Sequence, residues 1–284
     1  MFKKILSYTK KYGIGAASAV AVLGVLYYEK QVKHTDIAYT SWTNNFEPSV
    51  KWISNWDSRD PESLLQAPKS GEIDKNTDDY KNLIKTKTPT ASRHLVLIRH
   101  GHYNTDGLMD LERNLTKLGR EQADITGQRL KALNKPYTEL ISSTMTRAME
   151  TAEIIHQYFP LLDIERNDLL REGAPIPPEP PVGHWKPEFY KFYRDGPRIE
   201  AAFRKYFHRA NPEQQEDSHQ IIVCHANVIR YFVCRALQFP PEAWLRLSLA
   251  HASLTFVTIR PSGRVSIRGL GDIGHMPVEK LSYS

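Results

Sequence analysis

Two histidines, each directly following an apolar run, are the residues best placed to do chemistry in this chain. His100 follows residues 94–98 and Arg99, and His225 follows residues 220–224. Backbone hydrogen bonds at the end of a strand can fix one imidazole tautomer and leave the other ring nitrogen free as a neutral nucleophile. A single histidine at such a position is usually structural. The pair favours a catalytic role.

The residues on either side of His100 indicate which group such a nucleophile would attack. Arg99 supplies a planar positive charge suited to phosphate oxygens, and Gly101 has no side chain to hinder close approach of a phosphate to the backbone. The combination predicts a phosphate-binding site at the end of the first strand.

The surrounding pattern predicts the elements that hold these residues. Strands are expected at the runs named above and at residues 139–141, 254–259 and 265–269, and helices at residues 117–133, 146–158, 199–209 and 227–237. Thr116 is a plausible N-cap for the first of these helices. Residues 175–187 contain six prolines and can form neither element. Alternating strands and helices predict an α/β fold with a mainly parallel central sheet and its chemistry at the carboxyl ends of the strands.

The charge distribution and the cysteine content of the chain exclude some classes of protein. The chain has 284 residues and a net charge of +6, but residues 1–33 hold six lysines against one acid and contribute +5 of it. The other 251 residues hold 32 basic and 31 acidic groups, so we expect no nucleic-acid partner. Two cysteines, Cys224 and Cys234, are too few for a disulfide framework.

The lysine-rich start flanks a short apolar segment. Residues 12–28 carry no charge and would span about 25 Å as a helix, close to the lower limit for crossing a bilayer. We therefore expect residues 1–30 to form an uncleaved, single-pass anchor; a cleaved targeting segment and a buried helix are the alternatives. Lysines without acids before Glu29 are typical of mitochondrial targeting, which indicates the outer or inner mitochondrial membrane.

Residues 31–92 lack a clear periodic pattern and are expected to form a linker, flexible over residues 66–92. One segment of it, residues 52–60, contains Trp52 and Trp56 and is called the tryptophan motif below. Tryptophans in a polar region require burial, either on the same chain or on a neighbouring one. Both alternatives stay open from the residues alone.

Several motifs of residues 93–284 resemble those of the phosphoglycerate-mutase-like histidine phosphatases. They are Arg-His-Gly at 99–101, Leu-Thr-x-x-Gly-Arg-Glu-Gln-Ala at 115–123, the Ser-Ser-Thr-Met-Thr-Arg-Ala-x-Glu-Thr run at 142–151 and Leu-Arg-Glu-Gly-Ala-Pro at 170–175. Within that superfamily the chain is most similar to the mitochondrial serine/threonine-protein phosphatases. The resemblance implies a three-layer α/β/α sandwich with a mostly parallel sheet, and phosphoprotein substrates.

The resemblance also implies a role for each site residue. His100 would be the nucleophile that forms a phosphohistidine, and Glu172 the acid and base. The phosphate would be bound by His100 together with Arg99, Arg147 and His225. Arginines and histidines supply the positive charge in this arrangement, so no metal or other cofactor is expected.

The resemblance extends to the anchor and to the tryptophan motif, and it implies assembly into dimers and higher multimers. The residues expected to mediate assembly are Trp52, Asn55, Trp56, Asp57 and Arg59. Ile53 stands where the family usually has aspartate. Two other functions stay open: a membrane scaffold in which catalysis is secondary, and a phosphatase or mutase of small metabolites.

Overall fold

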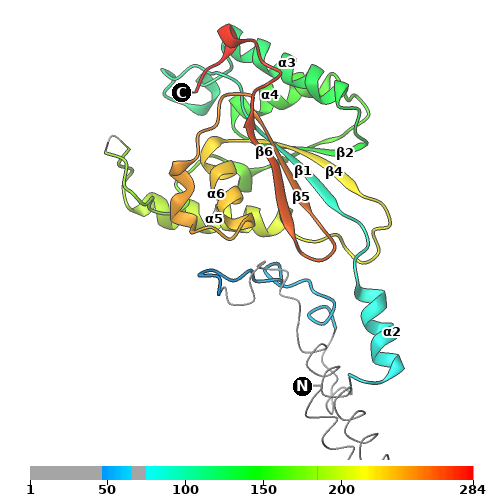
Figure 1. The fold of residues 1–284 in the computed structure, drawn as a ribbon. Coiled ribbons are helices and arrows are strands. Elements are labelled where there is room, and N and C mark those ends of the chain that lie inside the picture. Colours follow the sequence, from blue (N-terminus) through cyan, green and yellow to red (C-terminus); the bar gives the residue numbers. More distant parts are fainter. Residues whose placement is uncertain (1–46, 66–74, 184, 284) are drawn as a thin grey trace, which may run out of the picture. The chain divides into compact units, whose positions relative to one another are not determined.

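The computed structural model describes residues 47–65, 75–183 and 185–283. The chain divides into two compact units, Met1–Trp52 and Ile53–Ser284. The second unit holds the sheet and its helices (Figure 1). The anchor expected over residues 12–28 lies outside the described residues. No helix in the described part of the chain combines the length and the apolar character that a bilayer crossing needs.

The core of the second unit is a six-stranded sheet with the order β3-β2-β4-β1-β5-β6. The first four strands in this order are parallel, whereas β5 is antiparallel to β1 and β6 to β5. The sheet is therefore mixed. The short hairpin turn between β5 and β6 requires those two strands to be antiparallel. The strands are β1 Arg93–Arg99, β2 Tyr137–Ser143, β3 Ile164–Asn167, β4 Ser218–Cys224, β5 Leu254–Ile259 and β6 Val265–Asp272.

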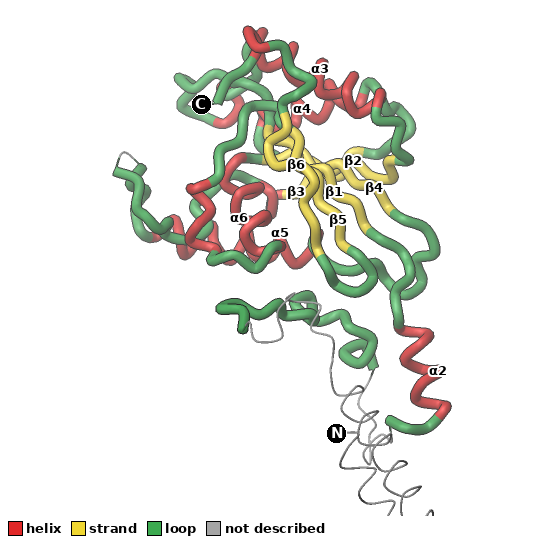
Figure 2. The backbone as a smooth tube through the Cα atoms, viewed as in Figure 1, coloured by secondary structure: helices red, strands yellow, loops and turns green. Residues whose placement is uncertain are grey.

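Helices cover both faces of this sheet, as expected (Figure 2). Along β1, Leu95 and Leu97 pack with α5 (Tyr190–Tyr206) and α6 (Ala226–Ala236). The alternate residues Val96 and Ile98 pack with α3 (Lys117–Ala132) and α4 (Thr146–His156). Because neighbouring strand residues point to opposite faces, both faces of β1 are apolar. The result is a three-layer α/β/α arrangement.

Two helices differ from the sequence prediction. Helix α5 begins at Tyr190 rather than at residue 199, and its early turns contain Gly196 and Pro197, which normally disfavour a helix. Gly196 is required by packing, since a β-carbon there would lie 2.6 Å from the carbonyl oxygen of Pro175. Helix α2 (Asp78–Lys87) occupies a segment predicted to be flexible linker; it buries none of its residues, so no apolar stripe marks it.

Residues 53–60 of the tryptophan motif pack on their own chain, whereas Trp52 is exposed. The indole N–H of Trp56 donates to the carbonyl oxygen of Gly263 at 2.8 Å, and the ring lies 5.9 Å from that of Phe203. Asp57 and Arg209 form an ion pair of 3.5 Å whose side chains are both almost fully buried. Gly263 lies in the β5–β6 turn, at the end of the sheet opposite to His100.

The register of the two central strands brings the histidines together. Strands β1 and β4 are parallel neighbours, and Arg99 pairs with Cys224. The next residue in each chain segment is a histidine, and the backbone N–H of His100 donates to the carbonyl of Cys224 at 3.0 Å. Both side chains therefore leave the sheet at the same carboxyl edge, as the sequence predicts.

Candidate active site

His100 is held as a neutral imidazole with a defined tautomer. Its Nδ1 lies 2.8 Å from the carbonyl oxygen of Gly101, and the Nε of Arg147 lies 3.1 Å from its Nε2. Because arginine can only donate, Nε2 carries the lone pair and Nδ1 donates to the carbonyl. Burial, reinforced by the nearby His225 and Arg147, holds the pKa of His100 well below its ordinary value. The lone pair needed by a nucleophile is therefore present at neutral pH.

Gly101 serves a packing role that differs from the one expected from sequence. A β-carbon on Gly101 would lie 2.4 Å from the carbonyl oxygen of Gly119 in the first turn of α3, so the approach that requires glycine is to a helix. The N-cap of that helix is Thr116, as expected. The Gly101 N–H donates to Thr151 Oγ1 at 3.0 Å, and Thr151 in turn donates to the Arg147 carbonyl. This links His100 and Arg147 through α4.

Arg147 comes from the first turn of α4 and is buried beside His100. Its guanidinium carbon lies 4.6 Å from the centre of the Tyr103 ring, a cation–π contact. Its Nη1 lies 3.8 Å from Asp110 Oδ1, at the long end of the range for an ion pair. The side chain is thus oriented by an aromatic face and a distant carboxylate, which leaves donors available for a ligand.

His225 precedes α6 and is fully buried, with its ring centre 5.1 Å from that of His100. Its Nε2 lies 2.8 Å from Ser143 Oγ at the end of β2. Its Nδ1 is buried and has no hydrogen-bond partner in the described part of the chain. Burial and the charge of Arg147 lower its pKa well below the ordinary value. The histidine pair is therefore neutral in this structure.

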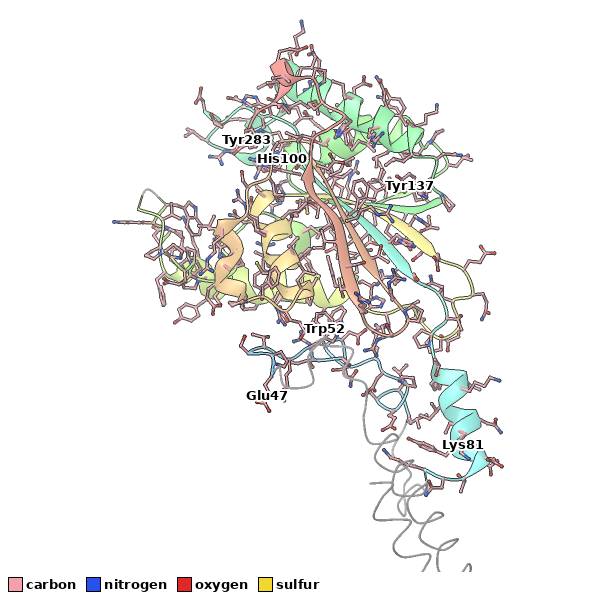
Figure 3. The ribbon with its side chains drawn as sticks, viewed as in Figure 1. Glu47, Trp52, Lys81, His100, Tyr137 and Tyr283 are labelled. Carbon is pink, nitrogen blue, oxygen red and sulfur yellow. The ribbon has the colours of Figure 1, made fainter. Side chains whose placement is uncertain are left out.

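Arg99 is positioned by the C-terminal segment. Its Nη1 donates to the carbonyl oxygens of Leu249 at 2.6 Å and Tyr283 at 2.5 Å. Figure 3 shows Tyr283 beside His100 at this edge of the sheet. Burial lowers the pKa of Arg99 to about 10, so the side chain stays charged at neutral pH. Arg99 therefore places a positive charge next to His100, and its guanidinium is held in position by two backbone carbonyl oxygens.

Glu172 lies on the loop between β3 and α5. Its Oε1 accepts a hydrogen bond from the Gly173 N–H at 3.1 Å, and its Oε2 lies 3.5 Å from the backbone nitrogen of Asn227 in the first turn of α6. Burial raises the pKa of Glu172, and the charges of Arg147 and Arg99 offset part of that effect. A carboxyl with a raised pKa beside a cationic site suits proton transfer.

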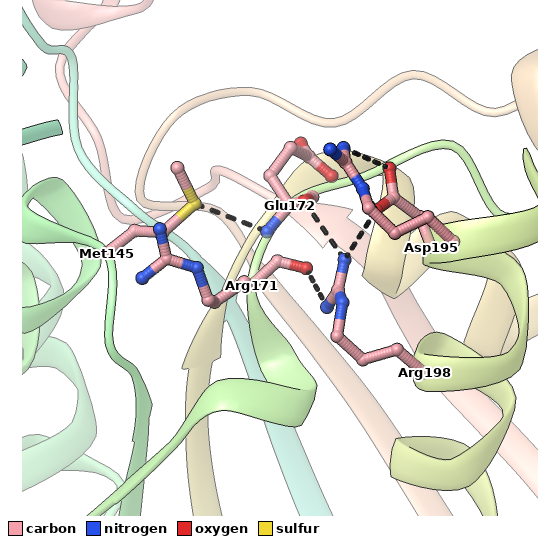
Figure 4. A pocket seen from close by; sticks show the side chains of 6 residues that line it. Met145, Arg171, Glu172, Asp195 and Arg198 are labelled. Carbon is pink, nitrogen blue, oxygen red and sulfur yellow. Dashed lines mark hydrogen bonds and ion pairs between the residues drawn. The ribbon is translucent and has the colours of Figure 1, made fainter. Parts of the chain in front are cut away.

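The open side of the site is formed by two adjoining hollows of about 460 and 390 Å³. Glu172 and Met145 line both of them, and Figure 4 shows Glu172 between residues of the β3–α5 loop and residues of α5. Arg147 lines the smaller hollow. His100 lies behind Arg147 and is only 2% exposed.

The structure brings together all five residues predicted to act in catalysis: His100, Arg147, His225, Arg99 and Glu172. The described motif residues Asn55, Trp56, Asp57 and Arg59 lie elsewhere, around Arg209 and Asn211. In the ranges that the structure describes, no group of three or more His, Cys, Asp or Glu side chains is arranged to hold a metal ion.

The site also contains five residues to which the sequence assigned no role: Tyr103, Ser143, Thr151, Asn227 and His251. Ser143 and Thr151 flank Arg147 in the same sequence motif, so that motif contained the signal for them. His251, whose ring centre lies 5.5 Å from that of His100, comes from the loop before β5. Its position depends on packing between distant segments, and no local pattern marks it.

A sequence model of the histidine phosphatase superfamily (branch 1) matches residues 95–175 and 187–272. The chain is 54% identical over 269 residues to the mitochondrial serine/threonine-protein phosphatase PGAM5 of Xenopus laevis, covering 94% of this chain and 96% of that protein. It is 50% identical over 245 residues to the human protein of that name, covering 86% and 84%.

Among solved structures, the chain is similar to phosphoglycerate mutase from Plasmodium falciparum, at 34% sequence identity and a TM-score of 0.48, covering 69% of this chain and 100% of that one. With the superfamily matched over most of the sheet and its helices, and with relatives at 50–54% identity along nearly the whole sequence, this chain belongs to branch 1 of the histidine phosphatase superfamily.

Proposed function

We propose that this chain is a protein-serine/threonine phosphatase that acts through a phosphohistidine on His100. The observation that carries the proposal is the neutral His100 imidazole, with Nδ1 bonded to Gly101 and the lone pair of Nε2 facing Arg147. Family membership and the names of the relatives support the reaction and the substrate class. Arginine and histidine side chains supply the charge that the reaction needs.

In the first step, His100 Nε2 forms a bond to phosphorus while the bond from phosphorus to the serine or threonine oxygen breaks. The departing oxygen is strongly basic, so it requires a proton, which Glu172 supplies in its protonated form. The hydrogen bond that Arg147 Nε donates to Nε2 shifts to a phosphoryl oxygen. His225 and Arg99 stabilise the charge on those oxygens.

In the second step, Glu172, now ionised, takes a proton from a water molecule that attacks the phosphohistidine. The bond between phosphorus and nitrogen breaks, and its electron pair returns to Nε2. Phosphate leaves, and both His100 and Glu172 return to their starting protonation states.

The mechanism is tested by trapping the intermediate. The protein is incubated with a phosphopeptide labelled with ³²P on serine, then denatured in alkali, which preserves phosphohistidine. We expect label on His100 that is released by mild acid, and none on the His100→Ala variant. Phosphatase activity retained by His100→Ala would refute the mechanism. Full cellular function without activity would favour a scaffold role instead.

We further propose that residues 1–30 anchor the protein in a mitochondrial membrane through the span at residues 12–28. The uncharged run behind four lysines and the names of the relatives support this. The test compares full-length protein with protein lacking residues 1–30 in isolated mitochondria. Resistance of the full-length protein to extraction by alkaline carbonate is expected; its complete release would contradict the anchor.

We also propose that the protein forms multimers through the tryptophan motif. The motif fits a surface formed by Phe203, Arg209 and Gly263 of its own chain, and the same surface on a second copy would accept it equally well. Exchange of the motif between copies would then link them. An unchanged particle size for Trp56→Ala by light scattering would contradict this assembly mode.

A further inference from the structure

We propose that the hollows beside Glu172 select phosphopeptides that carry acidic side chains next to the phosphorylated residue. The inference rests on the proposed phosphatase function and adds the class of protein sequence on which it acts best. The two hollows share Met145, Glu172, Arg194 and Asp195, so they form one continuous surface, called the cationic groove below.

The groove is lined by six basic side chains and two acidic ones. The acids are Glu172 and Asp195, and the bases are Arg113, Arg147, Arg171, Lys191, Arg194 and Arg198. With all eight ionised, the lining carries a charge of +4. A phosphoserine dianion neutralises half of this, so the bound phosphate alone leaves the groove positive. Burial raises the pKa of Glu172, and protonation of Glu172 would make the net charge of the groove lining more positive still.

Some of these basic side chains already bond to acidic groups or carbonyl oxygens of the protein, and others keep most of their donors available. Arg198 donates to the carbonyl oxygens of Leu169, Arg171 and Glu172 and lies 3.7 Å from Asp195, so it holds the loop in place. Figure 4 shows the contacts of Arg198 with Arg171, Glu172 and Asp195. Arg194 pairs with Asp195 at 2.9 Å. Arg194 and Arg198 therefore stabilise the walls of the groove, and their charge is largely neutralised within the protein.

Two arginines of the groove form no ion pair with an acidic residue in the described part of the chain. Arg171 donates to Thr144 Oγ1 at 3.2 Å, and the Nε of Arg113 donates to the carbonyl oxygen of Gly107 at 2.9 Å. Within the described residues, neither forms an ion pair with a carboxylate. Each guanidinium has five N–H groups, so most of the donors on both side chains remain available. These two residues are the strongest candidates to bind carboxylates of a substrate.

The shape of the groove favours a peptide over a small metabolite. The combined opening extends from Arg113 past Glu172 to Arg171, and the smaller hollow also includes the aromatic side chain of Trp185 and the ring of Pro187. Such a surface can contact several residues on either side of a phosphoserine. Basic residues in those positions would be repelled by the same charges.

The experiment compares three phosphoserine peptides of equal length whose flanking residues are alanine, aspartate or lysine. We expect kcat/KM for the aspartate peptide to exceed that for the alanine peptide by roughly fivefold at low salt, since exposed ion pairs are individually weak. The lysine peptide should be the poorest. The advantage of the aspartate peptide should shrink in 0.5 M salt, which screens exposed charges.

The variant to compare is Arg113→Gln combined with Arg171→Gln, and Arg129→Gln serves as a control for the loss of a charge outside the groove. Arg129 lies in the exposed last turn of α3, several turns from the end that contacts Gly101, so its loss changes net charge without changing the groove. We expect the ratio of kcat/KM between aspartate and alanine peptides to fall to below about twofold in the double variant. The control should keep the ratio of the unaltered protein.

Equal kcat/KM for the three peptides, with label still trapped on His100, would overturn the groove proposal and leave the phosphatase function standing. A preference that persists unchanged in the double variant would also overturn it. Failure of all three peptides to react, with no label trapped on His100, would instead refute the phosphatase function itself.

Discussion

The Nε of Arg147 lies 3.1 Å from the Nε2 of His100, although 47 positions separate the two residues along the chain. The contact joins the proposed nucleophile to a guanidinium that can bind the phosphoryl group. It also fixes which nitrogen of His100 carries the lone pair. The site therefore holds the proposed nucleophile and the proposed phosphate-binding cation in register before substrate arrives, which is the arrangement that lowers the cost of reorganisation during reaction.

Replacing Arg147 with lysine should reduce kcat/KM for a phosphoserine peptide by roughly 100-fold. Lysine keeps the charge but loses the planar fork and the cation–π contact with Tyr103. Steady-state kinetics of Arg147→Lys against the unaltered protein measure the effect. The exposed Arg129→Lys serves as the control. A loss of less than threefold in Arg147→Lys would show that the guanidinium geometry is unimportant.

Replacing Glu172 with glutamine should affect substrates according to their leaving group. A serine alkoxide needs a proton, so we expect kcat/KM for the phosphoserine peptide to fall by roughly 1000-fold. Nitrophenyl phosphate has a weakly basic leaving group, and its phosphorylation step should fall by less than tenfold. Burst kinetics separate that step from hydrolysis of the intermediate. Equal losses for both substrates would assign Glu172 another role.

Acid should destabilise the fold through histidines that are buried in the neutral form. Burial and the charge of Arg93 lower the pKa of His208 to about 4, and burial and the charge of Arg99 lower that of His251 to about 3, both from an ordinary value of 6.5. A lowered pKa means that the unfolded chain binds protons first as the pH falls. The resulting stability is fully present above pH 6.5 and is lost as the pH falls toward 4 and then 3.

The expected result is a melting temperature that declines between pH 6.5 and pH 4. His208 lies away from the proposed active site, with its Nδ1 2.6 Å from the carbonyl oxygen of Arg209. His208→Gln cannot take up this proton, so the variant should show a shallower decline over the same range. Thermal melts recorded by circular dichroism would measure both slopes. Parallel slopes for the two proteins would contradict the assignment.

The C-terminal segment should support phosphate binding through Arg99. Removing residues 282–284 deletes the Tyr283 carbonyl that accepts from Arg99, and also the Ser282 hydroxyl that contacts Gln122 and His251. We expect KM to rise roughly tenfold, mainly because the charged Arg99 guanidinium loses a hydrogen bond. Tyr283→Ala is the matched control because it keeps the backbone carbonyl. An equal effect in both variants would point to the tyrosine ring instead.

The tryptophan motif should contribute to folding stability through its buried ion pair. Asp57 and Arg209 are both almost fully buried, and the backbone N–H of Arg209 also donates to Asp57 Oδ2 at 2.8 Å. Asp57→Asn leaves the arginine charge buried without a carboxylate, which should lower the free energy of unfolding by about 3 kcal/mol. Denaturant titration measures this. The exposed Asp78→Asn in α2 should change stability little, and a similar result for Asp57→Asn would show that the pair is unimportant.

Much of the layered fold follows from the sequence because its strands and helices have local signatures. The apolar runs ending at residues 98 and 224 are short, and they match the central strands β1 and β4 closely. Thr116 marks the start of α3 through a hydrogen bond to a residue three positions away. Patterns of this kind depend on neighbouring residues only, so they can be read without knowledge of the fold.

How those elements meet depends on contacts between distant parts of the chain. The Arg147–His100 contact, the bond from Arg99 to Tyr283 and the packing of Trp56 on Gly263 join residues 47, 184 and 207 positions apart. Each depends on strand register and on the packing of whole helices, and no local pattern encodes either. Local sequence patterns indicate which residues are suited to catalysis. The fold decides which nitrogen of His100 carries the lone pair, because that choice depends on partners brought from distant parts of the chain.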